Sequence, residues 1–142
     1  MKIYLSSPFF NEEEIRNMRE TQKILQDRKF DLVVPMDIII PNTNEVEWAE
    51  KMFQADKQGI DDSDVVVLLY YGLYSDSGTA WECGYAYANN KPVVVVHCNE
   101  TQKNNLMVVF GAAANLERIE DLKTYDFKNI IKTSFHGHTS LS

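Results

Sequence analysis

The sequence predicts an α/β fold: a single domain built on a doubly wound, mainly parallel sheet flanked by helices, as in flavodoxin-like and Rossmann-like proteins. Four short apolar runs, at residues 3–5, 32–34, 65–70 and 92–96, alternate with segments of helical character. The last two runs are continuous and β-branched, which is typical of strands covered on both faces. Strands that alternate with helices form βαβ units, and these units build parallel sheets.

Four helices are predicted around these strands. Asn11 supplies an N-cap side chain and Glu14 stands at the third helical position, so the first helix should run from there to about residue 28. A second helix is predicted over residues 45–60, a third from about residue 78 to 89, and a fourth over roughly residues 105–113. The inward positions of the second helix are expected to include Val46, Ala49, Phe53 and Ile60.

Composition narrows the class of protein. The chain has 142 residues, 44% hydrophobic and 25% charged, which fits one globular domain, assigned to residues 1–135 and followed by a polar tail at residues 136–142. The formal net charge of −7 disfavours nucleic acids and membrane surfaces, which need clustered Lys and Arg. Cys83 and Cys98 match no metal or redox spacing, and no secretory signal or membrane span is recognised. We therefore expect a cytoplasmic protein without metal or cofactor.

The fold class also predicts where ligands bind. In open α/β sheets they lie beyond the carboxyl ends of the strands, which selects residues 6–11, 36–37, 71–79 and 97–105. The third segment is the richest, because Asp76 lies in its loop and Glu82 is expected in the first turn of the following helix. It contains neither the G-x-G-x-x-G pattern of dinucleotide sites nor the Gly-Lys-Ser/Thr of a phosphate loop.

Glu82 has two interpretations. Residues 79–82, Thr-Ala-Trp-Glu, form a capping-box pattern, in which the carboxylate only satisfies the start of a helix. Alternatively, Glu82 is a nucleophile at a ligand-facing helix start, kept ionised by the helix dipole, with Gly78 and Gly84 leaving room for a substrate.

Three further residues also have structural interpretations when taken singly. Asp76 is a typical turn residue, Asp56 a typical solvated helix residue, and Tyr4 a typical core residue. Taken together with Glu82, they would place three acids and a phenol around one cleft. Glycosidic chemistry driven by carboxylates requires such a grouping.

Five segments, in order along the chain, resemble the nucleoside 2-deoxyribosyltransferase family. The central one, residues 76–84, has an Asp six residues before the Glu that acts as nucleophile in the family. The five segments are residues 2–10 (KIYLSSPFF), 55–60 (ADKQGI), 76–84 (DSGTAWECG), 105–107 (NLM) and 122–127 (LKTYDF).

The resemblance implies a role for each catalytic residue. Glu82 would attack C1′ of the deoxyribose and form a covalent deoxyribosyl-enzyme, and Tyr4 would hydrogen-bond Glu82 and orient it. Asp76 and Asp56 would lie beside the nucleobase, where a carboxyl group can protonate the departing base and deprotonate the incoming one.

The resemblance also implies binding residues and an assembly. Phe9 and Phe10 would wall the base and sugar pocket. Asn105 would bind the sugar hydroxyl end from a neighbouring subunit, with Met107 packed close by, in a homohexamer built as a trimer of dimers. Family members often end in an aromatic residue whose terminal carboxylate reaches a sugar hydroxyl, whereas this sequence ends in residues 139–142, Thr-Ser-Leu-Ser.

The predicted function is transfer of 2-deoxyribose between purine or pyrimidine bases, with retention, ping-pong kinetics and slow hydrolysis when no acceptor base is present. Two alternatives stay open. A 2′-deoxynucleoside 5′-monophosphate N-glycosidase would need a phosphate pocket; Ser6 and Ser7 could contribute to one, but no Arg lies in the four selected segments. A non-catalytic nucleoside-binding module would use Glu82 only as a cap.

Overall fold

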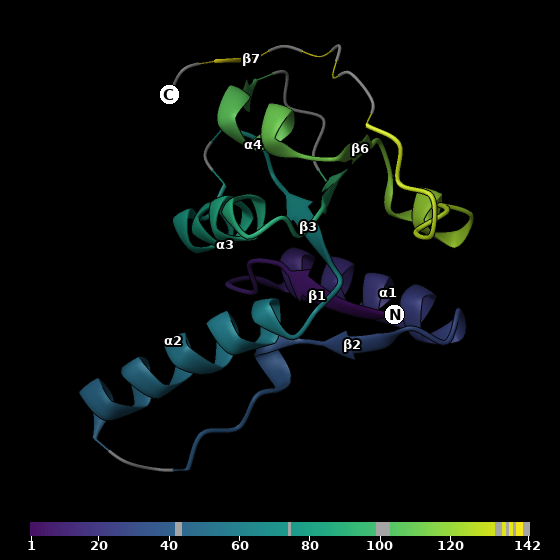
Figure 1. Cartoon of the computed structure of the whole chain (residues 1–142). Helices are drawn as coiled ribbons and strands as arrows, with labels where there is room; N and C mark the ends of the chain where they lie inside the picture. The colour runs from purple at the N-terminus through teal and green to yellow at the C-terminus, as the bar shows by residue number, and fades with distance from the viewer. Residues whose placement is uncertain are drawn as a thin grey trace.

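Five parallel strands form the central sheet, in the order β2-β1-β3-β4-β6 (Figure 1). The computed structural model describes residues 1–41, 44–73, 75–98, 103–132, 135, 137 and 139–140. All neighbouring strands of this sheet are parallel, which confirms the predicted α/β class. The strands are β1 (Lys2–Ser6), β2 (Asp31–Val33), β3 (Val65–Tyr70), β4 (Val93–His97) and β6 (Ala114–Leu116).

β6 was not predicted from the sequence. Its three residues, Ala-Asn-Leu, form no apolar run. The strand is defined by its parallel pairing with β4, from Val94↔Ala114 to Val96↔Leu116. A second small sheet pairs β5 (Asn104–Asn105) with β7 (Thr139–Ser140). Part of the predicted polar tail therefore runs beside Asn105, and residues 136, 138, 141 and 142 of that tail lie outside the described residues.

The four predicted helices are present. They are α1 (Glu12–Asp27), α2 (Glu45–Asp61), α3 (Ser77–Ala88) and α4 (Leu106–Gly111), with short 3-10 helices η1 (Pro35–Asp37) and η2 (Ile119–Lys123). As predicted, the Asn11 side chain caps α1 by accepting from the Glu14 backbone N–H at 2.9 Å. The Asn44 side chain caps α2 in the same way, accepting from Glu47 N–H at 2.9 Å.

Helices cover both faces of the sheet, because side chains alternate along each strand. Ile3 and Leu5 of β1 point into a core shared with α1 and η2. Tyr4, between them, points into the opposite core, which includes Ile60 of α2 and Cys83 of α3. The side chain of Tyr4 therefore reaches the same side of the sheet as the helices that carry Asp56 and Glu82.

α2 packs against the sheet through its last turn. Its buried residues are Gly59 and Ile60, and its first turns extend away from the rest of the fold (Figure 1). The predicted inward positions Val46, Ala49 and Phe53 were wrong, since all three are exposed; Ile60 alone of that set is buried. An apolar periodicity gives the presence of an apolar face but not what covers it: Phe53 contacts Trp81 of α3 and remains 47% exposed, and Val46 is 76% exposed.

Gly59 permits this attachment. A Cβ atom at position 59 would lie 2.9 Å from Cγ1 of Val33 and 3.0 Å from Cε2 of Tyr4. Such distances are shorter than van der Waals contact, so a side chain here would push α2 away from β1 and β2. The glycine thus lets the last turn of α2 lie directly against the ring of Tyr4.

Candidate active site

A cleft of about 550 Å³ opens at the carboxyl ends of β1 and β3, the two neighbouring strands between which the strand order of the sheet reverses. Strand orders of this kind bind ligands at that switch point, and the volume lies in the range of small-molecule sites. Backbone and small side chains complete a wall made largely of aromatic and acidic residues. Those residues are Phe9, Phe10, Phe53, Trp81, Asp56, Asp76 and Glu82.

Two of the four predicted ligand-facing segments line this cleft, and the other two do not in their described parts. Residues after β1 and before α3 line the cleft as predicted by the sheet rule. Neither residue of the segment after β2, Met36 or Asp37, lines the cleft, although Pro35 before them does. Asp37 instead pairs with Arg19 at 2.8 Å. The segment after β4 does not line this cleft in its described part, and residues 99–102 lie outside the described residues.

Glu82 does not cap a helix. The N-cap of α3 is Asp76, whose Oδ2 accepts from the Thr79 backbone N–H at 3.0 Å, so Glu82 is the sixth helical residue and lies in the second turn. Its carboxylate accepts two side-chain hydrogen bonds instead, from the Tyr4 hydroxyl at Oε2 and from Ser6 Oγ at Oε1, the latter at 2.8 Å. The capping interpretation and the predicted first-turn position of Glu82 were both wrong.

The two donors come from one face of one strand. Tyr4 and Ser6 of β1 are both completely buried, and residues two apart on a strand point to the same side. Sequence reasoning gave Ser6 no role beside Glu82, although its spacing from Tyr4 was a signal for it. Burial and the adjacent Glu82 carboxylate raise the pKa of Tyr4 above its usual value, so Tyr4 stays protonated and acts as a donor.

Burial of the Glu82 carboxylate raises its pKa to about 7, the dominant effect at this residue. The hydrogen bonds from Tyr4 and Ser6 lower the pKa, and the charges of Asp56 and Asp76 raise it. The predicted effect of the helix N-terminus is therefore not what governs Glu82, since the residue lies beyond the first turn. Its ionised form depends on the two hydroxyl donors.

Asp56 faces Glu82 from α2 and has an oxygen available. Burial raises its pKa to about 6. Its Oδ1 atom is enclosed and has no hydrogen-bond partner among the described residues. By contrast, Oδ2 of Asp76 is engaged in capping α3. Of the two aspartates, Asp56 is the better placed to exchange a proton with a ligand.

Aromatic rings line both sides of the cleft. Phe9 and Phe10 stack with ring centroids 6.1 Å apart and remain 40% and 76% exposed. Phe53 of α2 meets Trp81 of α3 edge to face at 5.4 Å. Sequence reasoning did not select Phe53 or Trp81 as site residues, although Phe53 lies three residues before Asp56 on the same helical face.

Asn105 and Met107 do not reach this cleft within one chain. Both line a second cavity of about 560 Å³ between α3 and α4. The Asn105 backbone N–H donates to the Tyr70 hydroxyl at 2.8 Å, and its side-chain oxygen accepts from the Met107 N–H at 2.9 Å. Gly84 opens onto this second cavity, whereas Gly78 lines the Glu82 cleft.

The described residues show neither a metal-binding cluster nor a membrane-spanning helix. Over that part of the chain, no group of three or more His, Cys, Asp and Glu side chains is arranged to hold a metal ion. None of its helices combines the length and the apolar character needed to cross a membrane.

Residues 3–126 match the family model described as Nucleoside 2-deoxyribosyltransferase. The chain belongs to this family. The match covers the cleft and every described element from β1 to η2. Membership in the nucleoside 2-deoxyribosyltransferase family, a family of pentosyltransferase enzymes, confirms the resemblance seen in the sequence.

Individual relatives agree with this assignment. A nucleoside deoxyribosyltransferase from Lactobacillus johnsonii is 33% identical over 82 residues, which cover 57% of this chain and about half, 55%, of that protein. One from Limosilactobacillus fermentum is 28% identical over 152 residues, covering 94% of this chain and 90% of the relative. A solved structure of the 2-deoxyribosyltransferase from Bacillus psychrosaccharolyticus superposes with a TM-score of 0.88 at 30% identity, covering 96% of this chain and all, 100%, of that one.

The hydroxyl of Tyr4 is expected to keep the pKa of Glu82 from rising further. In Tyr4→Phe the ring still fills its place against Gly59, but one donor to the ionised carboxylate is lost, so the Glu82 pKa should rise above about 7. The measurement is a pH titration of the Glu82 side-chain carbon by NMR. Thr21→Val is the control, because that buried hydroxyl bonds only its own helix; an unchanged or lower Glu82 pKa in Tyr4→Phe would contradict the assignment.

Proposed function

We propose that this protein transfers 2-deoxyribose between nucleobases through a covalent intermediate on Glu82. The observation that carries the proposal is the Glu82 carboxylate, held by Tyr4 and Ser6 and facing an aromatic cleft with Asp56 opposite. Family membership supports the same reaction.

In the first step, an oxygen of Glu82 attacks C1′ of the bound deoxynucleoside. The C1′–N bond breaks, its electron pair goes to the base nitrogen, and Asp56 supplies a proton to the departing base. Tyr4 and Ser6 hold the carboxylate in line, and the negative charge of the site stabilises the oxocarbenium character that develops at the sugar. The product is a deoxyribosyl ester of Glu82 and a neutral free base.

The proton in this step belongs on Asp56. Burial raises the pKa of both acids, to about 6 for Asp56 and about 7 for Glu82, so between pH 6 and 7 the free protein holds one proton on the pair, mainly on Glu82. Glu82 accepts two hydroxyl donors, which stabilise its ionised form, and Oδ1 of Asp56 accepts none from the described residues. Attack on C1′ requires the other arrangement, with Glu82 ionised and Asp56 protonated, and the two hydroxyl donors to Glu82 make this arrangement accessible.

In the second step, a different base attacks C1′ and displaces Glu82, while Asp56 takes the proton from the incoming base. Two displacements at one carbon retain the configuration of the starting nucleoside, and release of the first base before entry of the second gives ping-pong kinetics. Water entering the same position hydrolyses the ester slowly. The flat faces of Phe9, Phe10 and Trp81 provide stacking surfaces for either base.

The cleft disfavours the two alternative functions. Its described lining includes three acids, Asp56, Asp76 and Glu82, and neither Lys nor Arg, so a 5′-monophosphate would enter a negative site. A binding module with Glu82 as a helix cap is also disfavoured, since Asp76 performs the capping.

Loss of the Glu82 carboxylate is expected to abolish exchange. With deoxyinosine and excess cytosine, the unmodified protein should yield deoxycytidine and hypoxanthine. Glu82→Gln keeps the size of the side chain but is a far weaker nucleophile, so product formation should fall by at least about a thousandfold. Glu50→Gln, at an exposed position of α2, is the control; near-normal exchange by Glu82→Gln would exclude Glu82 as the nucleophile.

The positions of Asn105 and Met107 support a shared site in a homo-oligomer, for which the family suggests a hexamer built as a trimer of dimers. Met107 is 73% exposed and Phe110 51% exposed, next to a cavity that nothing in the described chain fills. The exposed apolar face of α2 offers a further contact surface. We expect such an assembly to act on nucleosides and free bases in the cytoplasm, in nucleotide salvage.

Mixing two inactive variants tests whether the site is shared. Glu82→Gln and Asn105→Ala should each lose exchange. Dissociated and reassembled together at equal amounts, they should regain about a quarter of the normal activity, because a complete site forms wherever Glu82 of an Asn105→Ala subunit meets Asn105 of a Glu82→Gln subunit. No recovery in a mixed oligomer, verified by light scattering, would show that Asn105 does not complete a neighbour's site.

A further inference from the structure

α2 carries Asp56 but is held to the rest of the chain mainly by its last turn. Gly59 and Ile60 are its buried residues, and Gly59 lies against the ring of Tyr4. The hydroxyl of Ser63, just past the helix, donates to the Gly59 carbonyl at 2.6 Å. The distance of Asp56 from Glu82 therefore depends on how this last turn is fixed relative to α3.

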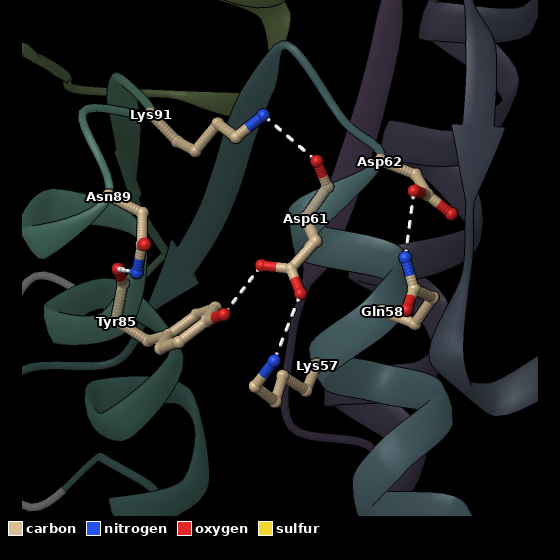
Figure 2. Close-up of polar contacts among 7 residues, drawn as sticks. All are labelled: Lys57, Gln58, Asp61, Asp62, Tyr85, Asn89 and Lys91. Carbon is tan, nitrogen blue, oxygen red and sulfur yellow. Dashed lines mark hydrogen bonds and ion pairs between the residues drawn. The ribbon is translucent and has the colours of Figure 1, made fainter.

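One residue of that turn, Asp61, is bonded directly to α3. The Tyr85 hydroxyl donates to Asp61 Oδ1 at 2.5 Å, and Lys57 Nζ donates to Oδ2 at 3.0 Å (Figure 2). Lys91, just beyond α3, donates to the Asp61 backbone carbonyl at 2.9 Å. Figure 2 shows these side chains converging on Asp61 from both sides of the gap between α2 and α3.

The contact lies close to both acids of the site along the chain. Asp61 follows Asp56 by five residues in α2, and Tyr85 follows Glu82 by three in α3. The α2–α3 contact is thus roughly one helical turn from each carboxyl group. A shift at Asp61 moves Asp56 with it, because both belong to one continuous helix.

The ring of Tyr85 also contacts a residue of the cleft wall, Trp81. It stacks on Trp81 with centroids 5.3 Å apart and planes 7° from parallel, and Trp81 meets Phe53 of α2 at 5.4 Å. Phe53 and Trp81 both line the cleft. The two helices therefore touch twice, through aromatic rings at the cleft and through the Asp61–Tyr85 hydrogen bond behind it.

We propose that Asp61 and Tyr85 are positioning residues, whose hydrogen bond fixes α2 against α3 and thereby holds Asp56 opposite Glu82. The consequence for catalysis rests on the proposed function, whereas the consequence for the geometry of the cleft does not. A merely structural role predicts something different: a partly exposed pair at the surface contributes little to stability, and its loss would leave the carboxyls of the cleft unchanged.

If the contact between α2 and α3 is weakened, the pKa of Asp56 is expected to change in a definite direction. Enclosure by the protein is what raises the pKa of Asp56, so water entering between the helices should lower it toward the ordinary value near 3.9. The other titratable groups at the cleft are Tyr4 on β1, Glu82 on α3 and Asp76 at the N-cap of α3, and a change at Tyr85 alters none of them chemically.

The test is Tyr85→Phe, which keeps the ring on Trp81 and removes only the hydroxyl. We expect the Asp56 pKa, measured by NMR titration of the side-chain carbon, to fall by about one unit or more. The kcat for base exchange should fall about tenfold with KM little changed, since the substrate pocket remains but the acid is displaced. Asp61→Asn, which retains an oxygen acceptor for Tyr85, should preserve most of both values.

Asp62→Asn is the matched control. Asp62 lies at the same helix end and accepts from Gln58 Nε2 at 2.9 Å, a contact that stays within α2 and does not reach α3 (Figure 2). The Asp62→Asn substitution should leave the pKa of Asp56 and the kcat for base exchange unchanged. A folded Tyr85→Phe protein with the normal Asp56 pKa would overturn the proposal, as would a loss of kcat matched by Asp62→Asn. If the unmodified protein exchanges no bases, the proposed function fails, and the NMR titration still decides the positioning role.

Discussion

An enclosed carboxylate needs donors, and the hydrogen bonds that Tyr4 and Ser6 give to Glu82 are the contacts on which this site depends. Both donors lie on β1, which sits between β2 and β3 in the sheet and is completely buried from Ile3 to Ser6. A strand in that position has little freedom to move. Glu82, the proposed nucleophile, is therefore held by a fully buried inner strand, although it belongs to a helix at the cleft.

The opposite wall of the cleft is built differently. Asp56 belongs to α2, which has few buried residues and reaches the sheet only because Gly59 has no side chain to hold it away from Tyr4. The two acids thus differ in environment: Glu82 receives two hydroxyl donors, while an oxygen of Asp56 has none from the described residues. This difference in hydrogen bonding supports the proposed roles of Glu82 as nucleophile and Asp56 as proton carrier.

The fold class could be predicted from the sequence, because buried parallel strands leave continuous β-branched runs such as residues 65–70 and 93–96. Short elements and exposed helix faces could be predicted less well. β6 has three residues without an apolar run, and the apolar face of α2 is exposed in the single chain. For β6 the missing information lies in its pairing with β4, and for α2 it lies in which elements the folded chain places against the helix, neither of which the local pattern contains.

The site residues were predictable as a group but not in their geometry. Two overlapping capping signals, at Asp76 with Thr79 and at Thr79 with Glu82, could each start α3, and only the folded chain selects the first. That choice moves Glu82 into the second turn, toward Tyr4 and Ser6. Asn105 and Met107 were selected by family likeness, and the fold of one chain leaves them at the second cavity.

The most direct measurement of the central claim is peptide mapping by mass spectrometry after the protein is denatured rapidly during turnover of deoxyinosine without an acceptor base. The account predicts a deoxyribosyl ester on the peptide that contains Glu82, and its disappearance when cytosine is added before denaturation. Base exchange that proceeds with the ester on another residue, or with no ester on the protein at any time, would contradict it.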